Sequence, residues 1–463
     1  MKELKNVKSD EGKLQRELGL FSVVLFIYGY VVGVGVLIQS GVTAAITGPM
    51  LWLAFVIAAI PAIINAIIFC YVGSAFPVSG GAWVYSSRLG SPFLGMLVVA
   101  TVMLNVMGGL ALVALGFGIY FEIFIPNSFL IVAILILIVF YLINLFGIKF
   151  TGAVQVILVI FGDLLVIFIF IIFGLPNIKP GNFIDSQGGL FPTGIIGILM
   201  GVIILNFSYQ GYTSVIEIGG EIKNPRRNIP LALIISFILI CTVYILIAIV
   251  MVGVMDWRTL GRIEGTVVDV AALFFPSWML LFLSILILVA IASTIHAILL
   301  AYSRNLFSAA RDCLLPSFIS KLNKRFNTPH WSLTIFTVGA LLLLFFQANV
   351  IDLSIVTSFT GSISGLIIAY LPIKLEEKYP ELMKNSRFKL KRKVLIGFIA
   401  FNFAYAILSI LLMAIISPMA VIISVIFYAG ALIYYFIRKR WLAKRGIDLR
   451  EICKTIPEEA LEV

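Results

Sequence analysis

The sequence predicts an all-helical integral membrane protein, and three features lead to this fold class. Of 463 residues, 61% are hydrophobic and only 12% are charged, which leaves too little polar surface for a water-soluble domain. The apolar runs are much longer than the strands of a membrane barrel, and they do not alternate with period two. Because backbone groups in hydrocarbon must be bonded within the protein, these runs are expected to be helices.

Twelve apolar segments approach the length of about 20 residues that a helix needs to cross the hydrocarbon core. The predicted spans are residues 18–38, 50–72, 93–119, 127–146, 153–173, 193–219, 230–254, 278–303, 331–347, 350–371, 394–416 and 419–437. The stretch 331–371 could also form one buried run. The polar residues Gln347, Ala348 and Asn349 instead favour a hairpin between two spans.

The distribution of positive charge supports twelve spans and sets their orientation. With a cytoplasmic N-terminus, only Lys179, Arg258 and Arg262 of the 33 Lys and Arg residues lie outside. Merging 331–371 into one span would place the basic cluster from Lys374 to Lys393 outside, against the positive-inside rule. We therefore expect a multi-pass protein of the cell (plasma) membrane with both termini in the cytoplasm.

The net charge of +11 is explained by this topology. The positive residues lie at helix ends, where anionic lipid is the natural partner, so nucleic acid is excluded as a partner. The cytoplasmic tails are residues 1–17 and 438–463. The segment before Leu18 lacks the apolar core of a cleavable signal peptide. The loops are too short for a soluble catalytic domain, so any chemistry is expected within the membrane.

Two predicted helices carry interruptions near their middle. The first contains Gly29, Gly33 and Gly35, and the sixth contains the run 206–211, which ends in Gly211. Two interrupted helices at equivalent places in successive five-helix halves indicate an inverted repeat with a site at the membrane midplane. Close helix packing through small residues is the alternative explanation. The predicted repeats are residues 18–173 and 193–371, followed by peripheral helices within 394–437.

An interrupted helix provides backbone groups that can bind charge. Freed amide N–H groups at a half-helix N-terminus bind a carboxylate, and freed carbonyls bind an ammonium group or a metal cation. Dehydrating both charges of a zwitterion is costly, so fixed dipoles must replace the water. Backbone groups that can bind a carboxylate and an ammonium group together favour an amino acid over a sugar as the substrate.

Four further stretches carry recognisable motifs. They are Gly33–Leu37, Phe76–Tyr85, Gly220–Pro230 and Ser303–Pro316. Together they resemble the amino acid/polyamine/organocation superfamily from about Leu18 to Trp331, while the later helices match only in number and length. The resemblance implies the LeuT-like fold, with five plus five core helices, interrupted helices 1 and 6, and two peripheral helices. It also implies transport of amino acids or polyamines by alternating access.

The resemblance assigns substrate contacts to both interruptions. The amides of Val34 and Gly35 are expected to bind the carboxylate, and Gly33 belongs to the same turn. The carbonyls of Val31, Phe207 and Gln210 are expected to bind the amine, beside Gly211. Phe207 is also a candidate aromatic gate.

The pocket wall is less well defined by the sequence. Tyr30, Asn105 and Tyr212 are candidates to shape it, although ordinary bundle packing also explains the two tyrosines. The third helix has no acidic side chain, which favours a neutral amino acid over a polyamine or a cationic substrate.

The eighth helix suggests a sodium site. In proton-coupled relatives a lysine of helix five stands where sodium sits in sodium-coupled ones, but this chain has Gly162 there. Ala290, Ser293 and Thr294 instead resemble the sodium ligands of the LeuT-like fold, completed by the carbonyls of Gly29 and Val32. The alternative is that both hydroxyls bond back to the preceding turn. No other cofactor is expected.

Proton coupling is the second possibility. Asp163 and His296 are ionisable residues at membrane depth, where such groups are costly and usually functional. A single hydrogen-bonded histidine in a bundle is at least as good an explanation of His296.

Four charged residues at the predicted cytoplasmic mouth are candidates for an inner gate. They are Arg88, Glu221, Lys223 and Arg304. The alternative for the basic ones is that they anchor the topology, whereas the positive-inside rule requires no acid at Glu221.

The predicted function is therefore a cation-coupled secondary transporter (permease) of amino acids, acting as a monomer or homodimer. The alternatives are a polyamine or amino acid exchanger and a sensor that binds without transport. An enzyme is disfavoured because Asp163 and His296 have no metal-ligand spacing or phosphate-binding loop beside them. A channel is disfavoured because no selectivity-filter motif is present.

Overall fold

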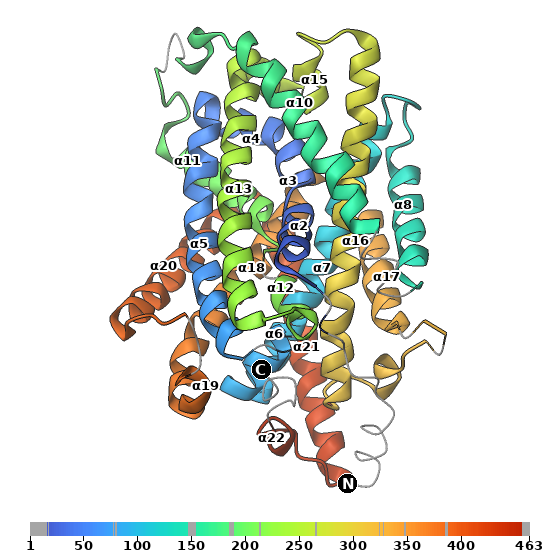
Figure 1. Cartoon of the computed structure of the whole chain (residues 1–463), viewed down its shortest axis with the longest axis vertical. Helices are drawn as coiled ribbons and strands as arrows, with labels where there is room; N and C mark the ends of the chain where they lie inside the picture. The colour runs from blue at the N-terminus through green and yellow to red at the C-terminus, as the bar shows by residue number, and fades with distance from the viewer. Residues whose placement is uncertain are drawn as a thin grey trace.

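The computed structural model is an elongated bundle of helices (Figure 1). It describes residues 16, 18–76, 78, 81–146, 154–184, 189–212, 214–263, 266–323, 325–326, 328–346, 349–384 and 388–455. Across these residues the secondary structure is helical and contains no strand. The prediction of an all-helical fold is confirmed.

The helices of the described chain follow one another in this order: α2 (Leu20–Val31), α3 (Val34–Leu37), α4 (Gln39–Thr47), α5 (Leu51–Ala75), α6 (Gly81–Tyr85), α7 (Pro92–Phe121), α8 (Phe129–Asn144), α10 (Leu165–Gly174), α11 (Gly194–Leu205), α12 (Ser214–Glu217), α13 (Pro225–Val254), α14 (Trp257–Arg262), α15 (Val267–Ala271), α16 (Ser277–Arg311), α17 (His330–Phe346), α18 (Val350–Lys378), α19 (Pro380–Lys384), α20 (Arg392–Ile416), α21 (Pro418–Lys444) and α22 (Leu449–Ile452). Two short π-helices, η2 (Ser86–Gly90) and η3 (Val159–Leu164), and a 3-10 turn, η6 (Asn206–Tyr209), lie between them.

Nine helices of the described part are long and apolar enough to cross a membrane. They are Gln39–Ala75, Pro92–Phe121, Val154–Asn177, Gly194–Glu217, Pro225–Val254, Ser277–Arg311, Val350–Lys378, Arg392–Ile416 and Pro418–Lys444. Three shorter apolar helices, α2, α8 and α17, lie in the remaining predicted spans. Because these have only 12, 16 and 17 residues, the number of twelve spans stays a prediction.

The chain after the first interruption differs from the prediction. The first span was expected to end at residue 38, but α4 continues the helical path to Thr47. Its polar residues are buried in protein: the Gln39 amide donates to Ser354 Oγ at 2.5 Å, and α4 packs against α11 and α14. Hydropathy alone cannot identify a polar helix that is covered by its neighbours.

Helical hydrogen bonding stops twice near the middle of the bundle. α2 ends at Val31, and Val32 has extended backbone with ψ 116° before α3 begins. α11 passes into η6, after which Gln210 is extended with ψ 156°. α3 packs against η6, so the two interruptions lie side by side. Their relation by an inverted repeat stays a prediction.

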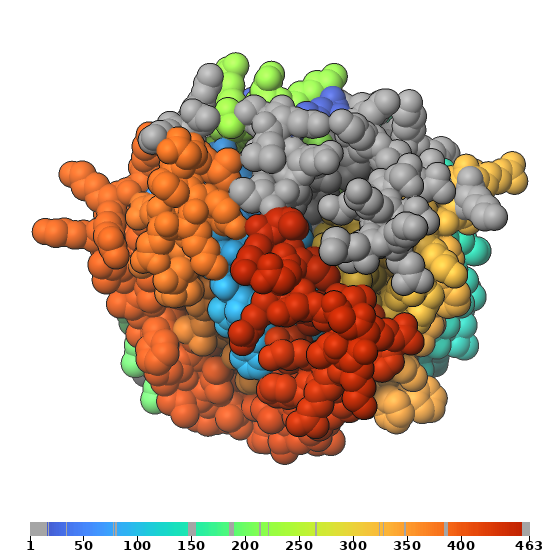
Figure 2. Space-filling model, turned by 90° about the horizontal axis from the view of Figure 1, so that it is seen from below, coloured from blue at the N-terminus to red at the C-terminus, as the bar shows by residue number. Residues whose placement is uncertain are grey.

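The end of the molecule that carries α19 and α22 is closed by segments that are distant in sequence. In Figure 2 the light-blue chain near residue 90 lies between an orange segment before residue 390 and the red C-terminal segment. Two contacts join these parts: Lys378 Nζ donates to Arg88 O at 3.3 Å, and Arg88 Nε donates to Thr455 O at 3.3 Å.

The peripheral helices α20 and α21 expose apolar side chains such as Leu411 and Ile426, as expected for lipid contact.

Candidate functional site

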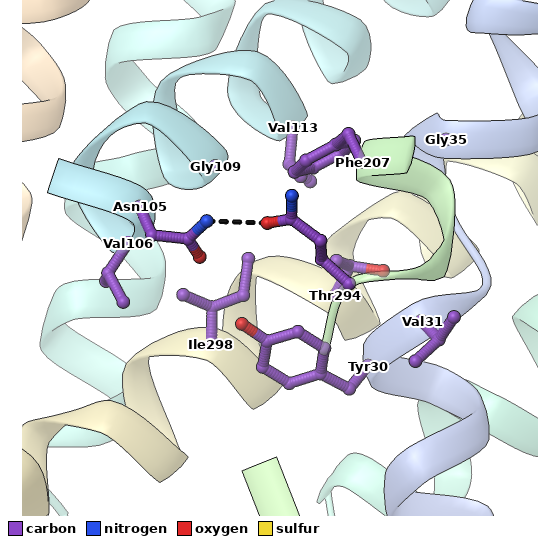
Figure 3. A pocket seen from close by; sticks show the side chains of 11 residues that line it. Tyr30, Val31, Gly35, Asn105, Val106, Gly109, Val113, Phe207, Thr294 and Ile298 are labelled. Atoms are coloured by element: carbon purple, nitrogen blue, oxygen red, sulfur yellow. Dashed lines mark hydrogen bonds between the residues drawn. The ribbon is translucent and has the colours of Figure 1, made fainter. Parts of the chain in front are cut away.

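A cavity with an empty volume of about 380 Å³ lies where the two interruptions meet (Figure 3). α2 and α3 contribute Tyr30, Val31 and Gly35 to its wall, while Phe207 and Gln210 come from η6 and the residue after it. Additional lining residues are Asn105, Val106, Gly109 and Val113 of α7 and Thr294 and Ile298 of α16.

The polar side of this cavity is an amide network between α7, η6 and α18. Asn105 Nδ2 donates to Gln210 Oε1 at 2.5 Å, the bond dashed in Figure 3. It also donates to Thr360 Oγ1 at 2.8 Å. Gln210 Nε2 donates to the carbonyl oxygen of Thr357 at 3.1 Å. Both amides are therefore held in fixed orientations, which favours recognition of a polar ligand over nonspecific binding.

The two interruptions are tied together by Tyr244 of α13. Its buried hydroxyl lies 2.6 Å from Val31 O and 2.8 Å from Ser208 O, one carbonyl from each interruption. The Val31 carbonyl, predicted to bind the amine, thus has a protein donor on one side. Tyr244 was missed by sequence reasoning, because nothing in the apolar sequence of α13 indicates that its single tyrosine faces the interruptions.

Glycine is required at two positions of the interruptions. Gly211 has φ +105°, which L-residues with a side chain rarely adopt, and its α-carbon lies against the Tyr30 ring. A Cβ on Gly35 would come within 2.6 Å of Ser208 Cα, so a side chain would separate α3 from η6.

The structure brings most predicted substrate residues together. Val31, Gly35, Phe207 and Gln210 line the first cavity. Gly211 lines a second, adjacent cavity that also reaches Tyr212. Gly33 lies against Thr294, and Val34 begins α3, although its side chain is outside the described part of the chain. The substrate contacts assigned to these residues stay predictions.

The five predicted cation ligands converge between α2 and α16. Thr294 Oγ1 lies 3.2 Å from both Gly29 O and Val32 O. Ser293 Oγ lies 3.3 Å from Gly29 O and 2.8 Å from Ala290 O. The last contact is also the bond to the preceding turn that was the alternative for this hydroxyl. Carbonyl and hydroxyl oxygens of this kind suit a hard cation.

Asp163 adds a carboxylate to this oxygen cluster. It lies on the π-helix η3, is fully buried, and its Oδ2 accepts a hydrogen bond from Ser293 Oγ at 2.7 Å. Its Oδ1 is buried without a hydrogen-bond partner among the described residues. Single π-helical turns often occur at functional sites. Sequence reasoning placed Asp163 in an alternative mechanism, whereas the structure places it beside the predicted sodium ligands.

His296 is oriented toward a different helix. Its Nδ1 is 2.9 Å from Asn144 Nδ2, and its ring packs on Phe140, both on α8. These contacts of His296 thus lie on α8, whereas Asp163 accepts from Ser293 of α16. No group of three or more His, Cys, Asp or Glu side chains suited to a metal occurs among the described residues.

The described contacts of the predicted inner-gate residues leave the gate itself a prediction. Arg88 is buried and pairs with Asp312 at 2.6 Å, and Trp83 Nε1 donates to the same carboxylate at 2.7 Å. Arg304 Nη1 donates to the carbonyl of Leu300 in its own helix.

The other two gate candidates, Lys223 and Glu221, are described less completely. Lys223 is exposed, and its backbone N–H donates to Leu18 O at 2.9 Å. The side chain of Glu221 is outside the described part of the chain. Asp312 was missed as the partner of Arg88, and Trp83 as a second donor to Asp312, because these residues lie in separate motifs that only the tertiary structure brings together.

Comparison with known proteins identifies relatives. A family model described as amino acid permease matches residues 18–438. The methylthioribose transporter of Bacillus subtilis (strain 168) is 27% identical over 410 residues, 82% of this chain and 86% of the relative. The branched-chain amino acid permease BcaP of the same organism is 25% identical, covering 81% and 84%. The vacuolar cationic amino acid transporter 4 of Arabidopsis thaliana is 29% identical, covering 78% and 64%.

Proposed function

This chain belongs to the amino acid permease family, and from that premise we propose that it is a secondary active transporter that moves an amino acid across the cell membrane by alternating access. The observation that carries the proposal is the buried cavity between two adjacent helix interruptions. Free backbone N–H and carbonyl groups at such interruptions match the two charges of a zwitterion. The fixed amides of Asn105 and Gln210 supply further polar contacts.

The names of the relatives support a transporter but not one substrate. They are described as carriers of methylthioribose, branched-chain amino acids and cationic amino acids. An amino acid agrees with the family description and with the site. A polyamine or amino acid exchanger uses the same fold and is the alternative, as is a sensor that binds without transport.

Transport is proposed to be coupled to a cation held near Gly29, Val32, Ala290, Ser293 and Thr294. Support comes from the oxygen atoms that converge there and from the buried Asp163 carboxylate beside them. A sodium ion at this position would bridge α2 and α16 next to the first interruption, so its binding would favour the substrate-binding arrangement. A proton on Asp163 is the second candidate, because it would also remove the charge of a fully buried carboxylate.

The proposal is tested with the purified protein in liposomes. Uptake of a panel of labelled amino acids is measured with an inward sodium gradient and, separately, with an inward proton gradient. Sodium-driven uptake that is lost in the double variant Ser293→Ala/Thr294→Ala supports the cation site. Ser424→Ala is the matched control, because the Ser424 hydroxyl is also buried but bonds to Ala420 O within the peripheral helix α21.

The outcomes separate the alternatives. Uptake driven only by the proton gradient and lost in Asp163→Asn would replace sodium with a proton as the coupling ion. Specific binding without uptake or exchange of any amino acid would favour the sensor. Absence of both binding and uptake across the panel would overturn the proposed substrate class.

A further inference from the structure

A second cavity adjoins the first and contains a carboxylate that the proposed transport cycle does not use. Its empty volume is about 890 Å³. Asn105, Gln210 and Gly211 line it at the helix interruptions, and Asn105 and Gln210 line the first cavity as well. Among the described residues that line the second cavity, Glu217 of α12 is the one charged side chain.

Glu217 is buried and hydrogen-bonded only by neutral groups of the described chain. Only 1% of the Glu217 surface is exposed. Oε1 accepts from the Ala82 backbone N–H at 3.2 Å, and Oε2 accepts from Asn305 Nδ2 at 3.1 Å. No Lys or Arg of the described part forms an ion pair with it. A charge buried at membrane depth is costly unless a counter-ion joins it, which makes such a group a functional candidate.

The cavity is suited to bring a cation to this carboxylate. Glu217 ends α12, six positions after Gly211 in the chain, and both residues line this cavity. Asn65 Oδ1 is a buried acceptor without a partner in the described structure, and Asn65 also lines the cavity. The rings of Tyr212 and Tyr302 line it too, and aromatic faces attract cations.

We propose that Glu217 binds the terminal ammonium or guanidinium group of a cationic amino acid whose α-amino and α-carboxylate groups lie at the helix interruptions. This rests on the proposed function and adds the substrate class. It replaces the sequence-based preference for a neutral substrate, which considered the third helix alone. Glu217 was missed because its position on α12 gives no sign that it faces a cavity shared with Asn105 and Gln210.

The experiment compares cationic amino acids with uncharged analogues of similar shape. Binding of labelled L-arginine and L-lysine to the detergent-purified protein is measured in competition with L-citrulline and L-norleucine. Because a hydrogen bond to a charged group contributes roughly 1.5–3 kcal/mol, the wild type should prefer each cation by at least about tenfold. In Glu217→Gln this preference should fall to less than about threefold, while the neutral analogues keep their affinity.

The variant keeps the local structure as far as the chain allows. The glutamine carbonyl can accept from Ala82 N, and Asn305 can rotate to present its Oδ1, which has no partner in the described structure, to the new amide. Glu376→Gln is the matched control: Glu376 accepts a hydrogen bond from Tyr71 and lines neither cavity. Its cation preference should remain that of the wild type.

Failure of this inference is distinguishable from failure of the proposed function. If the wild type binds citrulline as tightly as arginine and norleucine as tightly as lysine, Glu217 is a structural link between α6 and α16 and the inference is wrong. This comparison does not require Glu217→Gln to fold. A folded Glu217→Gln protein that retains the cation preference also overturns it. If the wild type binds no amino acid at all, the proposed function itself fails.

Discussion

Gly211 is the residue whose backbone conformation most directly restricts substitution. In Gly211→Ala, the φ of +105° would be strained, and the new methyl group would press on the Tyr30 ring beneath it. We expect a loss of roughly 1–3 kcal/mol from the strained backbone, with a further loss from the contact. The thermal unfolding midpoint and amino acid binding of the purified protein should both decrease.

The control is Gly430→Ala on α21, where a Cβ has no atom within 4 Å and φ is not positive. Replacing glycine with alanine inside a helix normally stabilises it by about 0.5–1 kcal/mol. Equal midpoints for the two variants would contradict the conformation assigned to Gly211.

Arg88 and Asp312 form the second residue-scale prediction. Their side chains are 4% and 11% exposed and 2.6 Å apart, so neither charge is well solvated. Asp312→Ala leaves a buried guanidinium unpaired and should destabilise the protein by about 3–5 kcal/mol. The double variant Arg88→Met/Asp312→Leu removes both charges and should recover much of this loss in thermal unfolding. A double variant as unstable as Asp312→Ala would show that the pair is not the cause.

At the scale of elements, the segment after α22 is predicted to remain packed on η2, where Arg88 Nε donates to Thr455 O at 3.3 Å. Cys453 follows α22 and is buried, which raises its pKa to about 11 from the ordinary 9.0. At pH 8 both pKa values lie above the ambient pH. Cys453 therefore has about a hundredfold less thiolate, the reactive form, than a cysteine with the ordinary pKa. Alkylation of Cys453 should therefore be slow in the native protein and should accelerate about tenfold per pH unit until pH approaches 11.

The measurement is mass spectrometry of the labelled peptides after timed exposure to iodoacetamide. Protein unfolded in dodecyl sulfate is the control, because its thiols lose their burial. Labelling of Cys453 at the same rate in native and unfolded protein would mean that the C-terminal segment does not rest on η2.

At the scale of the whole molecule, the sequence predicts features that are caused by one local segment and misses features that depend on contacts between distant segments. Long apolar runs identified helices such as α7 and α20, because crossing a membrane imposes length and hydropathy on one segment. Local spacing likewise identified Ser293 and Thr294, whose hydroxyls share one helical turn with Ala290. The polar helix α4 was not predicted, because its burial depends on α11 and α14.

The site residues that the sequence did not predict all have partners that are distant in the chain. Tyr244 contacts Val31 across 213 residues, and Trp83 contacts Asp312 across 229. Glu217 faces a cavity assembled from several helices. Periodicity within one segment contains no information on these partners, so single-sequence reasoning identified the chemistry of the interruptions but not the side chains that hold them together.

Orientation in the membrane is the remaining whole-molecule prediction, and the charge distribution determines it. In Figure 1, α15 and α22 lie at opposite ends of the bundle. Lys179, Arg258 and Arg262 are the basic residues assigned to the outer side, whereas the C-terminal segment that carries α22 is assigned to the cytoplasm. The two ends can be distinguished by single cysteines in a variant whose four native cysteines are replaced by serine.

Gly181→Cys and Lys454→Cys are matched probes for this test. A Cβ at Gly181 has no atom within 4 Å, and the Lys454 side chain is 70% exposed, so neither substitution disturbs packing. A membrane-impermeant maleimide should label Gly181→Cys on intact cells and Lys454→Cys only after permeabilisation. The opposite pattern would invert the protein, place the Arg88–Asp312 pair on the outer side and exclude it as the inner gate. The prediction that Arg88 belongs to an inner gate therefore depends on this labelling result.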